Sequence, residues 1–394
     1  MDSSNKLFLL DAYALIYRAY YAFIKNPRIN SKGFNTSAIL GFVNTLEEVL
    51  KKENPTHIGV AFDPPGPTFR HEAFEQYKAQ REETPEAIRL SVPIIKEIIR
   101  AYRIPILEVA GYEADDVIGT LATEAGRQGI ITYMMTPDKD YGQLVSDKVF
   151  MYRPKHTGGF EVMGVDEVKA KFDIQSPAQV IDMLGLMGDS SDNIPGCPGV
   201  GEKTAQKLIA EFGSIENLLE HTDQLKGALK TKVETNREMI TFSKFLATIK
   251  IDVPIQLEMD SLVREEADED SLRSIFEELE FRTLIDRVLK KGVSGNGITS
   301  TPGSKVATGK SAPSPLPLFP EEGGGIQGDL FANFTPNEPD EAKKSNLETL
   351  ESQPHNYQLI DTENKRRKII QKLLTSKILS LDTETTGTEP MDAE

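Results

Sequence analysis

Short apolar runs alternate with longer amphipathic stretches in the first half of the chain. The apolar runs predict β-strands over 6–10, 57–62, 106–109 and 131–135. Between them lie stretches with apolar residues at helical spacing, which predict helices, as over 36–52 and 113–127. Strands separated by helices are typical of a parallel sheet with crossover connections. We therefore predict an α/β fold here.

The pattern becomes helical in the second half of the chain. No run within 165–250 has the character of a strand. Apolar residues that recur there at helical spacing include Val180, Met183, Leu184 and Met187. The predicted fold class is therefore a parallel-sheet α/β core followed by a helical subdomain.

The composition changes near residue 292. The segment 292–356 is rich in Gly, Ser, Thr and Pro, so it cannot bury enough apolar surface to offset the entropy of ordering. Beyond it, the pattern predicts a helix over 363–374 and a strand over 378–381, the start of an α/β domain that is incomplete at Glu394. We expect a fragment of a longer protein. The predicted core, helical subdomain, flexible linker and incomplete domain cover 1–175, 176–291, 292–356 and 357–394.

Charge and cysteine content narrow the class of protein. The chain has 45 Lys and Arg against 61 Asp and Glu, a formal charge of −16, so a polyanion must meet a local basic patch. Cys197 is the single cysteine and cannot form an internal disulfide, and no Cys and His cluster has zinc-type spacing. The sequence shows neither a signal peptide nor a stretch able to span a bilayer. We expect a monomeric, cytoplasmic protein that does not bind membranes.

Carboxylates follow the predicted strands. Three of the apolar runs are followed closely by acids, namely Asp11, Asp63, and the pair Asp138 and Asp140. Ligands of an open parallel sheet bind beyond the carboxyl ends of its strands, so these acids should meet at one edge. Further candidates precede or follow predicted helices: Glu113, Asp115, Asp116, Asp189 and Asp192.

Nine carboxylates in one site need cations, because like charges within about 4–6 Å raise one another's pKa. Oxygen ligands without His or Cys fit Mg²⁺ or Mn²⁺, and two such ions about 3.5–4 Å apart support in-line hydrolysis of a phosphodiester. A strand-end Asp can instead cap the next helix, and acids at a helix start are favoured by the helix dipole. That alternative stays open for any one acid but explains the whole set poorly.

A Gly-rich segment before a predicted helix can hold a phosphate backbone. The segment 194–208 reads IPGCPGVGEKTAQKL, in which Gly199 and Gly201 allow close approach of a DNA strand to the helix start. Lys203 and Lys207 add charge, and residues 201–250 hold 8 basic and 7 acidic side chains. The pattern indicates a helix-hairpin-helix, with an ordinary turn between packed helices as the alternative.

The segment 68–89 combines cations with aromatic residues. Its candidate contacts to a single strand are Arg70, Lys78 and Arg81, interleaved with Phe69, Phe74 and Tyr77. Pro85 implies a mobile, helix-broken segment, part of a helical arch over about 68–103. A surface helix with a buried aromatic stripe is an equally open alternative.

Together these motifs resemble the 5′ nuclease domain of bacterial DNA polymerase I, in the flap endonuclease superfamily. The matching segments over residues 5–291 are, in family order, FLLDAYALIYRAYYA, AFD, FRHEAFEQYKAQR, GYEADDVIGTLA, TPDKDYGQLV and MGDSSDNIPGCPGVGEKTA. The resemblance implies a PIN-like core that hydrolyses 5′ flaps and RNA primers at branched DNA and RNA–DNA primer junctions, in replication and repair.

The resemblance also implies roles for single residues. The matched metal ligands divide into Asp63, Glu113, Asp115, Asp116 and Asp138 near one ion and Asp140, Asp189 and Asp192 near the other, with Asp11 also in the cluster. Lys78 and Arg81 match basic residues at the scissile phosphate, and Tyr77 matches a residue that stacks on the 5′ nucleotide. The positions that match a hairpin gripping duplex DNA, often with a bound K⁺, are Gly199, Gly201, Lys203 and Thr204.

Two motifs lie after residue 292. SLDTETTG at 380–387 resembles the first motif of a 3′-5′ proofreading exonuclease, in which Asp382 and Glu384 would bind metal. The chain holds no further motif of that kind, so we expect neither proofreading nor polymerase activity from it. Clamp-binding peptides of the form Gln-x-x-Leu-Phe are matched by Gln327, Leu330 and Phe331, unless these are a chance apolar cluster.

Two other classes of function compete with a nuclease. A non-catalytic module could recognise branched DNA through the hairpin and arch, but it gains nothing from a negative cavity facing phosphates. A metal-dependent phosphatase acting on small substrates would explain the carboxylates and leave the hairpin without a role. The set of acids favours the two-metal nuclease.

Overall fold

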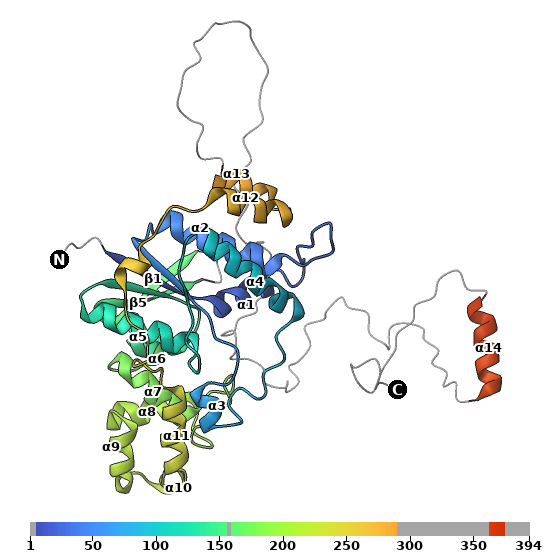
Figure 1. The fold of residues 1–394 in the computed structure, drawn as a ribbon. Helices are drawn as coiled ribbons and strands as arrows, with labels where there is room; N and C mark the ends of the chain where they lie inside the picture. The colour runs from blue at the N-terminus through green and yellow to red at the C-terminus, as the bar shows by residue number, and fades with distance from the viewer. Residues whose placement is uncertain (1–4, 156–158, 290–361, 375–394) are drawn as a thin grey trace, which may run out of the picture. The chain divides into compact units, whose positions relative to one another are not determined.

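The computed structural model describes residues 5–155, 159–289 and 362–374. The chain divides into two units at residue 335. The strands of the first unit are β1 (Lys6–Asp11), β2 (His57–Ala61), β3 (Ile106–Leu107), β4 (Ile131–Met135), β5 (Val149–Pro154) and β6 (Phe160–Met163) (Figure 1).

The α-helices of the first unit are α1 (Ala12–Ala22), α2 (Ser37–Lys52), α3 (Phe69–Ala73), α4 (Glu86–Ala101), α5 (Ala114–Arg127), α6 (Val165–Phe172), α7 (Val180–Met187), α8 (Glu202–Phe212), α9 (Ile215–Glu220), α10 (Gly227–Thr235), α11 (Arg237–Ala247), α12 (Glu269–Glu278) and α13 (Arg282–Leu289). The 3₁₀ helices are η1 (Lys139–Leu144), η2 (Pro177–Gln179), η3 (Thr222–Gln224) and η4 (Met259–Leu262).

The strands form one six-stranded sheet with the order β3-β2-β1-β4-β5-β6. The first five strands are parallel to their neighbours, and β6 runs antiparallel to β5 at the edge. The four strands predicted from the apolar runs are confirmed. The sequence pattern did not indicate β5 or β6. Because β1 lies between β2 and β4, the residues that follow these three strands come to the same edge of the sheet.

Alternate residues of β1 belong to two separate cores. Leu7 and Leu9 pack on one face together with α5, whereas Phe8 and Leu10 pack on the other face with α1, α2 and α4. Successive side chains of a strand point to opposite faces, so a sheet covered by helices on both sides buries every residue of its central strand. The predicted parallel α/β core is therefore confirmed.

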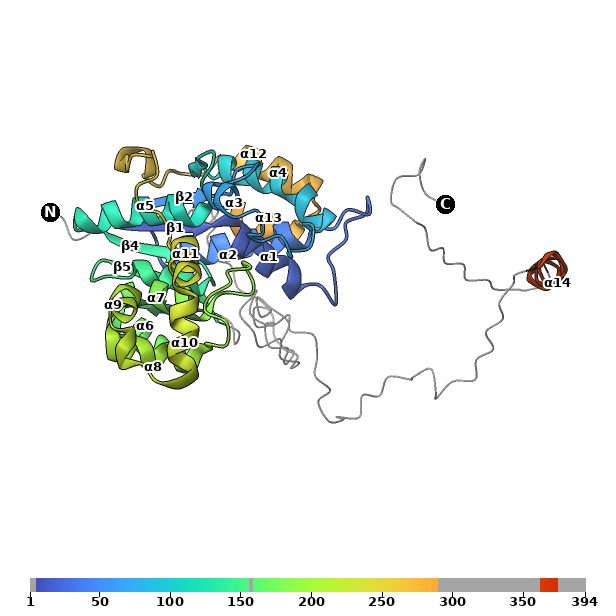
Figure 2. The same ribbon diagram turned by 90° about the horizontal axis from the view of Figure 1, so that it is seen from below.

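The helices α7 to α11 gather at one end of this unit, away from α12 and α13 (Figures 1 and 2). The four apolar residues predicted from helical spacing all lie on α7, and residues 165–250 contain no named strand. The Lys244 ammonium of α11 lies 2.6 Å from Asp182 of α7. Gly185 permits this approach of α11 to α7, because a Cβ there would lie 2.9 Å from Cβ of Lys244.

The segment 258–280, which is rich in Asp and Glu, packs against the core of the first unit. Val263 forms a β-bridge to His57 at the start of β2, and the Arg264 guanidinium donates to the Leu50 carbonyl oxygen at 3.1 Å. Leu272 and Phe276 of α12 are fully buried in the core that contains α2 and α4. The acids of α12 therefore occupy the outer side of a helix whose inner side is apolar.

The second unit is described over one helix, α14 (Glu363–Leu374), which matches the helix predicted there. The predicted linker over 292–356 and the predicted strand over 378–381 lie outside the described residues. In the described ranges of both units, each helix is too short or too polar to cross a lipid bilayer.

Candidate active site

The acids that follow β1, β2 and β4 lie at one edge of the sheet, as predicted. Asp11 ends β1, and its Oδ2 lies 3.1 Å from the Tyr141 hydroxyl and 3.3 Å from Thr136 Oγ1, both donors. Asp63 accepts a hydrogen bond of 2.7 Å from the N–H of Ala114, the first residue of α5. The end of β2 is thereby tied to the start of α5.

Three acids at the start of α5 form a compact group. Glu113, Asp115 and Asp116 each offer a carboxylate oxygen within 4.8 Å of the others. Asp116 Oδ2 also accepts a hydrogen bond of 3.1 Å from the Glu113 N–H, so the two acids cap the helix. The helix dipole also favours acids at the start of a helix, so it stabilises these three carboxylates independently of any bound ligand.

Arg70 supports this group from inside the molecule. It is only 1% exposed, and its guanidinium donates to both oxygens of Asp116 and to Glu113 at 2.8 Å. It also donates to the carbonyl oxygens of Leu246 and Thr248 at 2.9 Å. The prediction that Arg70 contacts DNA is therefore wrong. A guanidinium with buried carboxylate partners is held by them, and no sequence pattern reveals such partners.

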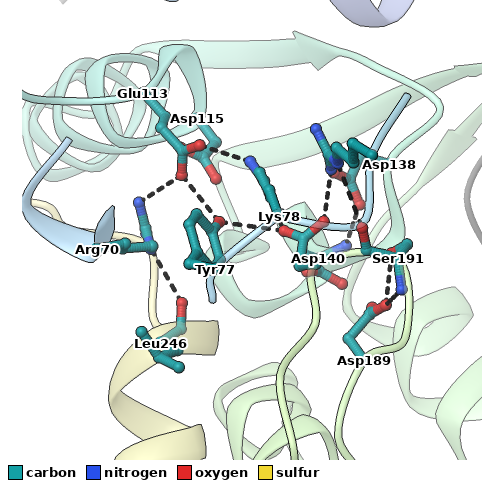
Figure 3. A network of polar contacts seen from close by, with 12 residues as sticks. Arg70, Tyr77, Lys78, Glu113, Asp115, Asp138, Asp140, Asp189, Ser191 and Leu246 are labelled. Atoms are coloured by element: carbon teal, nitrogen blue, oxygen red, sulfur yellow. Dashed lines mark hydrogen bonds and ion pairs between the residues drawn. The ribbon is translucent and has the colours of Figure 1, made fainter. Parts of the chain in front are cut away.

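The segment between α3 and α4 places Lys78 among the carboxylates (Figure 3). The Lys78 ammonium pairs with Glu113 and lies 3.7 Å from Asp192 Oδ2. The Tyr77 hydroxyl lies 3.0 Å from Glu113 and 3.1 Å from Asp192, so it can donate to either. Tyr77 is 3% exposed and packs edge-on against His71, so the prediction that its ring stacks on a nucleotide is wrong here.

The predicted arch over 68–103 is divided by this segment. The helix break at Pro85 is confirmed, because α4 begins at the next residue. However, α4 packs into the core through Ile88, Ile95 and Ile98, so this part of the segment is not a free arch. Arg81 is exposed and pairs with Asp192.

The loop after α7 brings two acids from the helical half to the site. Asp189 pairs with Ile194 in an isolated β-bridge, and its Oδ1 accepts a hydrogen bond of 2.7 Å from the Ser191 N–H. The Lys139 ammonium, from the TPDKD motif, lies 3.0 Å from Asp189 Oδ2. The turn requires Gly188, which has φ +74, because a Cβ there would lie 2.5 Å from the Ile194 carbonyl oxygen.

Backbone contacts hold the segment around Lys78 against this loop. The Lys78 N–H donates to the Asp192 carbonyl oxygen at 3.0 Å, and the Gln80 amide donates to that of Ser190 at 2.5 Å. In the opposite direction, the Asn193 amide donates to the Gln76 carbonyl oxygen at 2.6 Å. Sequence reasoning missed Gln80 and Asn193, since only their location inside the family motifs could have indicated them.

Burial and mutual repulsion disfavour the charged forms of several of these acids. Burial, and then the Asp63 carboxylate, raise the pKa of Asp11 to about 7. Burial and the nearest acid raise the pKa of Asp115 and of Asp140 well above the usual range. For Glu113 and Asp192 burial also raises the pKa, but the Lys78 ammonium and a neighbouring guanidinium outweigh it, and the pKa is lowered.

Asp140 has an oxygen without a partner. Its Oδ1 is buried and receives no hydrogen bond from any of the described residues. Burying a carboxylate oxygen without a donor or a cation is costly. With Asp138 and Asp189 raising the pKa of the same group, the oxygen-only donor set fits a hard divalent cation. The chain's own cations, Lys78 and Lys139, contact other acids of the cluster.

The predicted hairpin lies between α7 and α8. Gly199 has φ +75, in the left-handed region that favours glycine, and both Gly199 and Gly201 are exposed. The side chains of Lys203 and Lys207 are exposed on α8, and Thr204 is half-buried. The opposite face of α8 is buried through Ala205, Leu208, Ile209 and Phe212, as the apolar stripe predicted.

Several predicted site residues lie outside the described part of the chain. They are Gln327, Leu330 and Phe331 of the clamp-like peptide, and Asp382 and Glu384 of the exonuclease-like motif.

Comparison with known families gives two matches in chain order. Residues 6–173 match the 5′-3′ exonuclease, N-terminal resolvase-like domain, and residues 175–270 match the 5′-3′ exonuclease, C-terminal SAM fold.

Curated relatives named DNA polymerase I are similar to this chain. That of Bacillus subtilis is 43% identical over 291 residues, which are 73% of this chain and 33% of the relative. That of Chloroflexus aurantiacus is 35% identical over 392 residues, which are 98% of this chain and 39% of the relative. The chain thus spans about a third of the length of the curated relatives it matches.

Solved structures share the fold at low sequence identity. T5 5′-exonuclease with bound divalent metal ions (zinc) aligns with a TM-score of 0.54 and 21% identity, covering 69% of this chain and 99% of that one. The catalytic core of Rad2 in complex with DNA substrate aligns with a TM-score of 0.51 and 18% identity, covering 74% of this chain and 93% of that one.

The parallel sheet with an acidic edge and the helical part that follows it give this chain a PIN-like fold. Over residues 6–270 the chain belongs to the 5′-3′ exonuclease family, as the nuclease domain that it shares with its DNA polymerase I relatives.

Proposed function

We propose that this chain hydrolyses phosphodiester bonds near 5′ ends and flaps of branched DNA, using two divalent metal ions held by the carboxylate cluster. The single observation that carries this proposal is the buried Asp140 oxygen with no donor among the described residues. A cation would supply the missing partner and offset the repulsion among the acids. The oxygen donors favour Mg²⁺ or Mn²⁺.

One of the nine acids differs from the rest in its burial. Asp116 is fully buried and uses both oxygens for Arg70 and for the N–H groups of Glu113 and Lys250, so we assign it to support rather than to metal binding. The other eight acids remain our candidates for metal binding: Asp11, Asp63, Glu113, Asp115, Asp138, Asp140, Asp189 and Asp192.

When bound, two divalent ions activate water and stabilise both oxygens of an in-line displacement at phosphorus. Three residues of the segment between α3 and α4 would assist this reaction. Lys78 holds a positive charge between Glu113 and Asp192, where it can offset charge that develops on the phosphate. Tyr77 acts through its hydroxyl, which keeps Glu113 and Asp192 in place. Arg81, exposed beside Asp192, can contact the strand that enters the site.

The loop between α7 and α8 connects chemistry with DNA binding. It carries Asp189 and Asp192 at its start and Gly199 and Gly201 at its end. The first N–H groups of α8 have no acceptor within the helix, so they can bind a backbone phosphate, together with the exposed Lys203. A duplex gripped at the hairpin would therefore be coupled through a short loop to the metal-binding acids.

A non-catalytic module for branched DNA remains the second candidate. It is favoured by the hairpin, whose surface glycines and lysines are arranged for phosphate binding without help from the acids. The repulsive carboxylate cluster argues against it, because a module that only binds DNA gains nothing from it.

The test is cleavage of a 5′-labelled flap duplex by the purified chain, with Mg²⁺ and with EDTA. We expect metal-dependent product near the junction, and none from Asp140→Ala. Asp147→Ala, which changes an exposed acid beyond η1, is the matched control and should keep full activity. Tight binding without product would overturn the nuclease and favour the binding module.

The wider setting follows from the relatives' name and is part of the same proposal. A DNA polymerase I parent would use this domain to remove flaps and RNA primers during replication and repair in the cytoplasm. Binding of the peptide at 327–331 to the sliding clamp is a separate proposal. It predicts that Leu330→Ala with Phe331→Ala abolishes clamp binding, and unchanged binding would overturn it.

A further inference from the structure

A lysine from a distant helix reaches the hairpin. The Lys232 ammonium, on α10, donates to the carbonyl oxygen of Gly199 at 3.3 Å. A Cβ at Gly199 would lie 2.4 Å from this same nitrogen, so a side chain there would displace the ammonium from its present place. The two residues are 33 positions apart, and nothing in the sequence pattern joins them.

Across the described residues, no carboxylate lies within ion-pair distance of the Lys232 ammonium. By contrast, Lys230 on the same helix is 3.9 Å from Glu234. Lys203, at the start of α8, likewise has no ion pair within the described ranges. The hairpin is therefore flanked by two lysines that have no ion pair with the part of the chain that the structure describes.

The ammonium of Lys232 can make the contacts that a bound monovalent cation would make. A K⁺ ion bound at the Gly199 carbonyl would also attract a phosphate oxygen of DNA, because both oxygens are negatively polarised. An ammonium has three donors, so after donating to Gly199 it has two left for a phosphate. Lys232 thus offers one positive charge at a loop carbonyl and still faces solvent.

We propose that Lys232 is a phosphate-binding residue of the hairpin and takes the place of a bound K⁺, so that this chain grips duplex DNA without needing K⁺. This inference rests on the proposed binding of duplex DNA by the hairpin. It differs from the expectation of a K⁺ site that the family resemblance implied.

The experiment measures the affinity of the full chain for a fluorescent flap duplex in EDTA. The salt is either KCl or tetramethylammonium chloride at equal ionic strength, because the large cation cannot replace K⁺ at a carbonyl. We expect equal affinity of the wild-type chain in both salts. Lys232→Met should bind about three- to tenfold more weakly in tetramethylammonium, with a salt slope lower by about one. KCl should restore part of that loss.

Lys230→Met is the matched control, because it removes a lysine of α10 that pairs with Glu234 rather than with the hairpin. Circular dichroism and unfolding by urea show whether both variants are folded, which is expected since both side chains are at the surface.

Each contrary result has a different meaning. A wild-type chain that loses affinity when K⁺ is replaced would overturn the inference alone, as would Lys232→Met with wild-type affinity in both salts. A wild-type chain that fails to bind the duplex in either salt would overturn the proposed function and the inference together.

Discussion

The backbone N–H of Lys78 donates to the carbonyl oxygen of Asp192 at 3.0 Å, and the Lys78 ammonium lies 3.7 Å from the carboxylate of that same residue. Lys78 has φ +57, a left-handed conformation that non-glycine residues adopt at a cost. The segment that carries Lys78 and the loop that carries Asp192 are thereby joined at two points. These two contacts fix the position of the Lys78 ammonium among the carboxylates.

Removing this cation should impair turnover more than binding. Lys78→Met removes the charge that lies between Glu113 and Asp192, and we expect turnover of a flap duplex to fall about 10²- to 10³-fold. Duplex affinity in EDTA should stay within about threefold, because the hairpin is intact. Single-turnover cleavage and anisotropy titrations measure the two effects, with the surface variant Lys52→Met as control. Equal losses in rate and affinity would contradict a role in chemistry.

Asp140 should lower the stability of the chain without metal and raise it when metal is bound. Its carboxylate is buried, has an unsatisfied oxygen and is repelled by Asp138 and Asp189. We expect Asp140→Asn to unfold at a higher urea concentration than the wild-type chain in EDTA. Mg²⁺ should stabilise the wild-type chain and reverse the order, since a ligand stabilises only the state that binds it. A wild-type chain insensitive to Mg²⁺ would contradict the metal site.

Arg70 should be a major source of stability. Arg70→Met leaves the carboxylates of Glu113 and Asp116 buried without their shared cation, and breaking a buried pair costs about 3–5 kcal/mol. Denaturation by urea measures this loss. Arg89→Met, in which the arginine is largely exposed, should change stability by less than about 0.5 kcal/mol. Wild-type stability of Arg70→Met with lowered DNA affinity would restore Arg70 as a DNA contact.

Glu53 should contribute stability that disappears in acid. Burial raises its pKa, but hydrogen bonds from Lys6 and Tyr152 outweigh this, so its folded pKa lies below the ordinary value of 4.5. The contribution is then complete above about pH 4.5 and is lost as the pH falls through the lower folded value. The difference in unfolding free energy between wild type and Glu53→Gln should shrink from about pH 6 to about pH 3.5. A difference that does not change with pH would refute this account.

Lys203 should act on DNA binding alone. Lys203→Ala removes an exposed charge at the start of α8 and leaves the acids untouched. We expect weaker binding and a salt dependence of affinity that is lower by about one in slope, because one phosphate contact is lost. Cleavage at saturating enzyme should stay at the wild-type rate. Salt titrations of affinity measure the slope, and an unchanged slope would exclude a phosphate contact.

Much of this molecule was determined by local sequence pattern. Strands β1, β2 and β4 are continuous apolar runs because their sheet is covered on both faces, so the acids that follow them could be placed at one edge from the sequence alone. The hairpin could be located because glycine at positive φ leaves a distinct signature, as at Gly199. Strand β6 gave no such signal, since it is a short antiparallel edge strand.

The partners of charged and aromatic side chains were decided by tertiary structure alone. Arg70 and Tyr77 belong to a segment whose composition suits an exposed DNA-binding arch, yet both are buried because Glu113, from another part of the chain, lies against them. Lys232 reaches Gly199 by the packing of α10 beside the hairpin. A residue's type and spacing indicate which chemistry is possible, whereas burial and ion pairing depend on contacts between distant segments, which only the folded chain brings together.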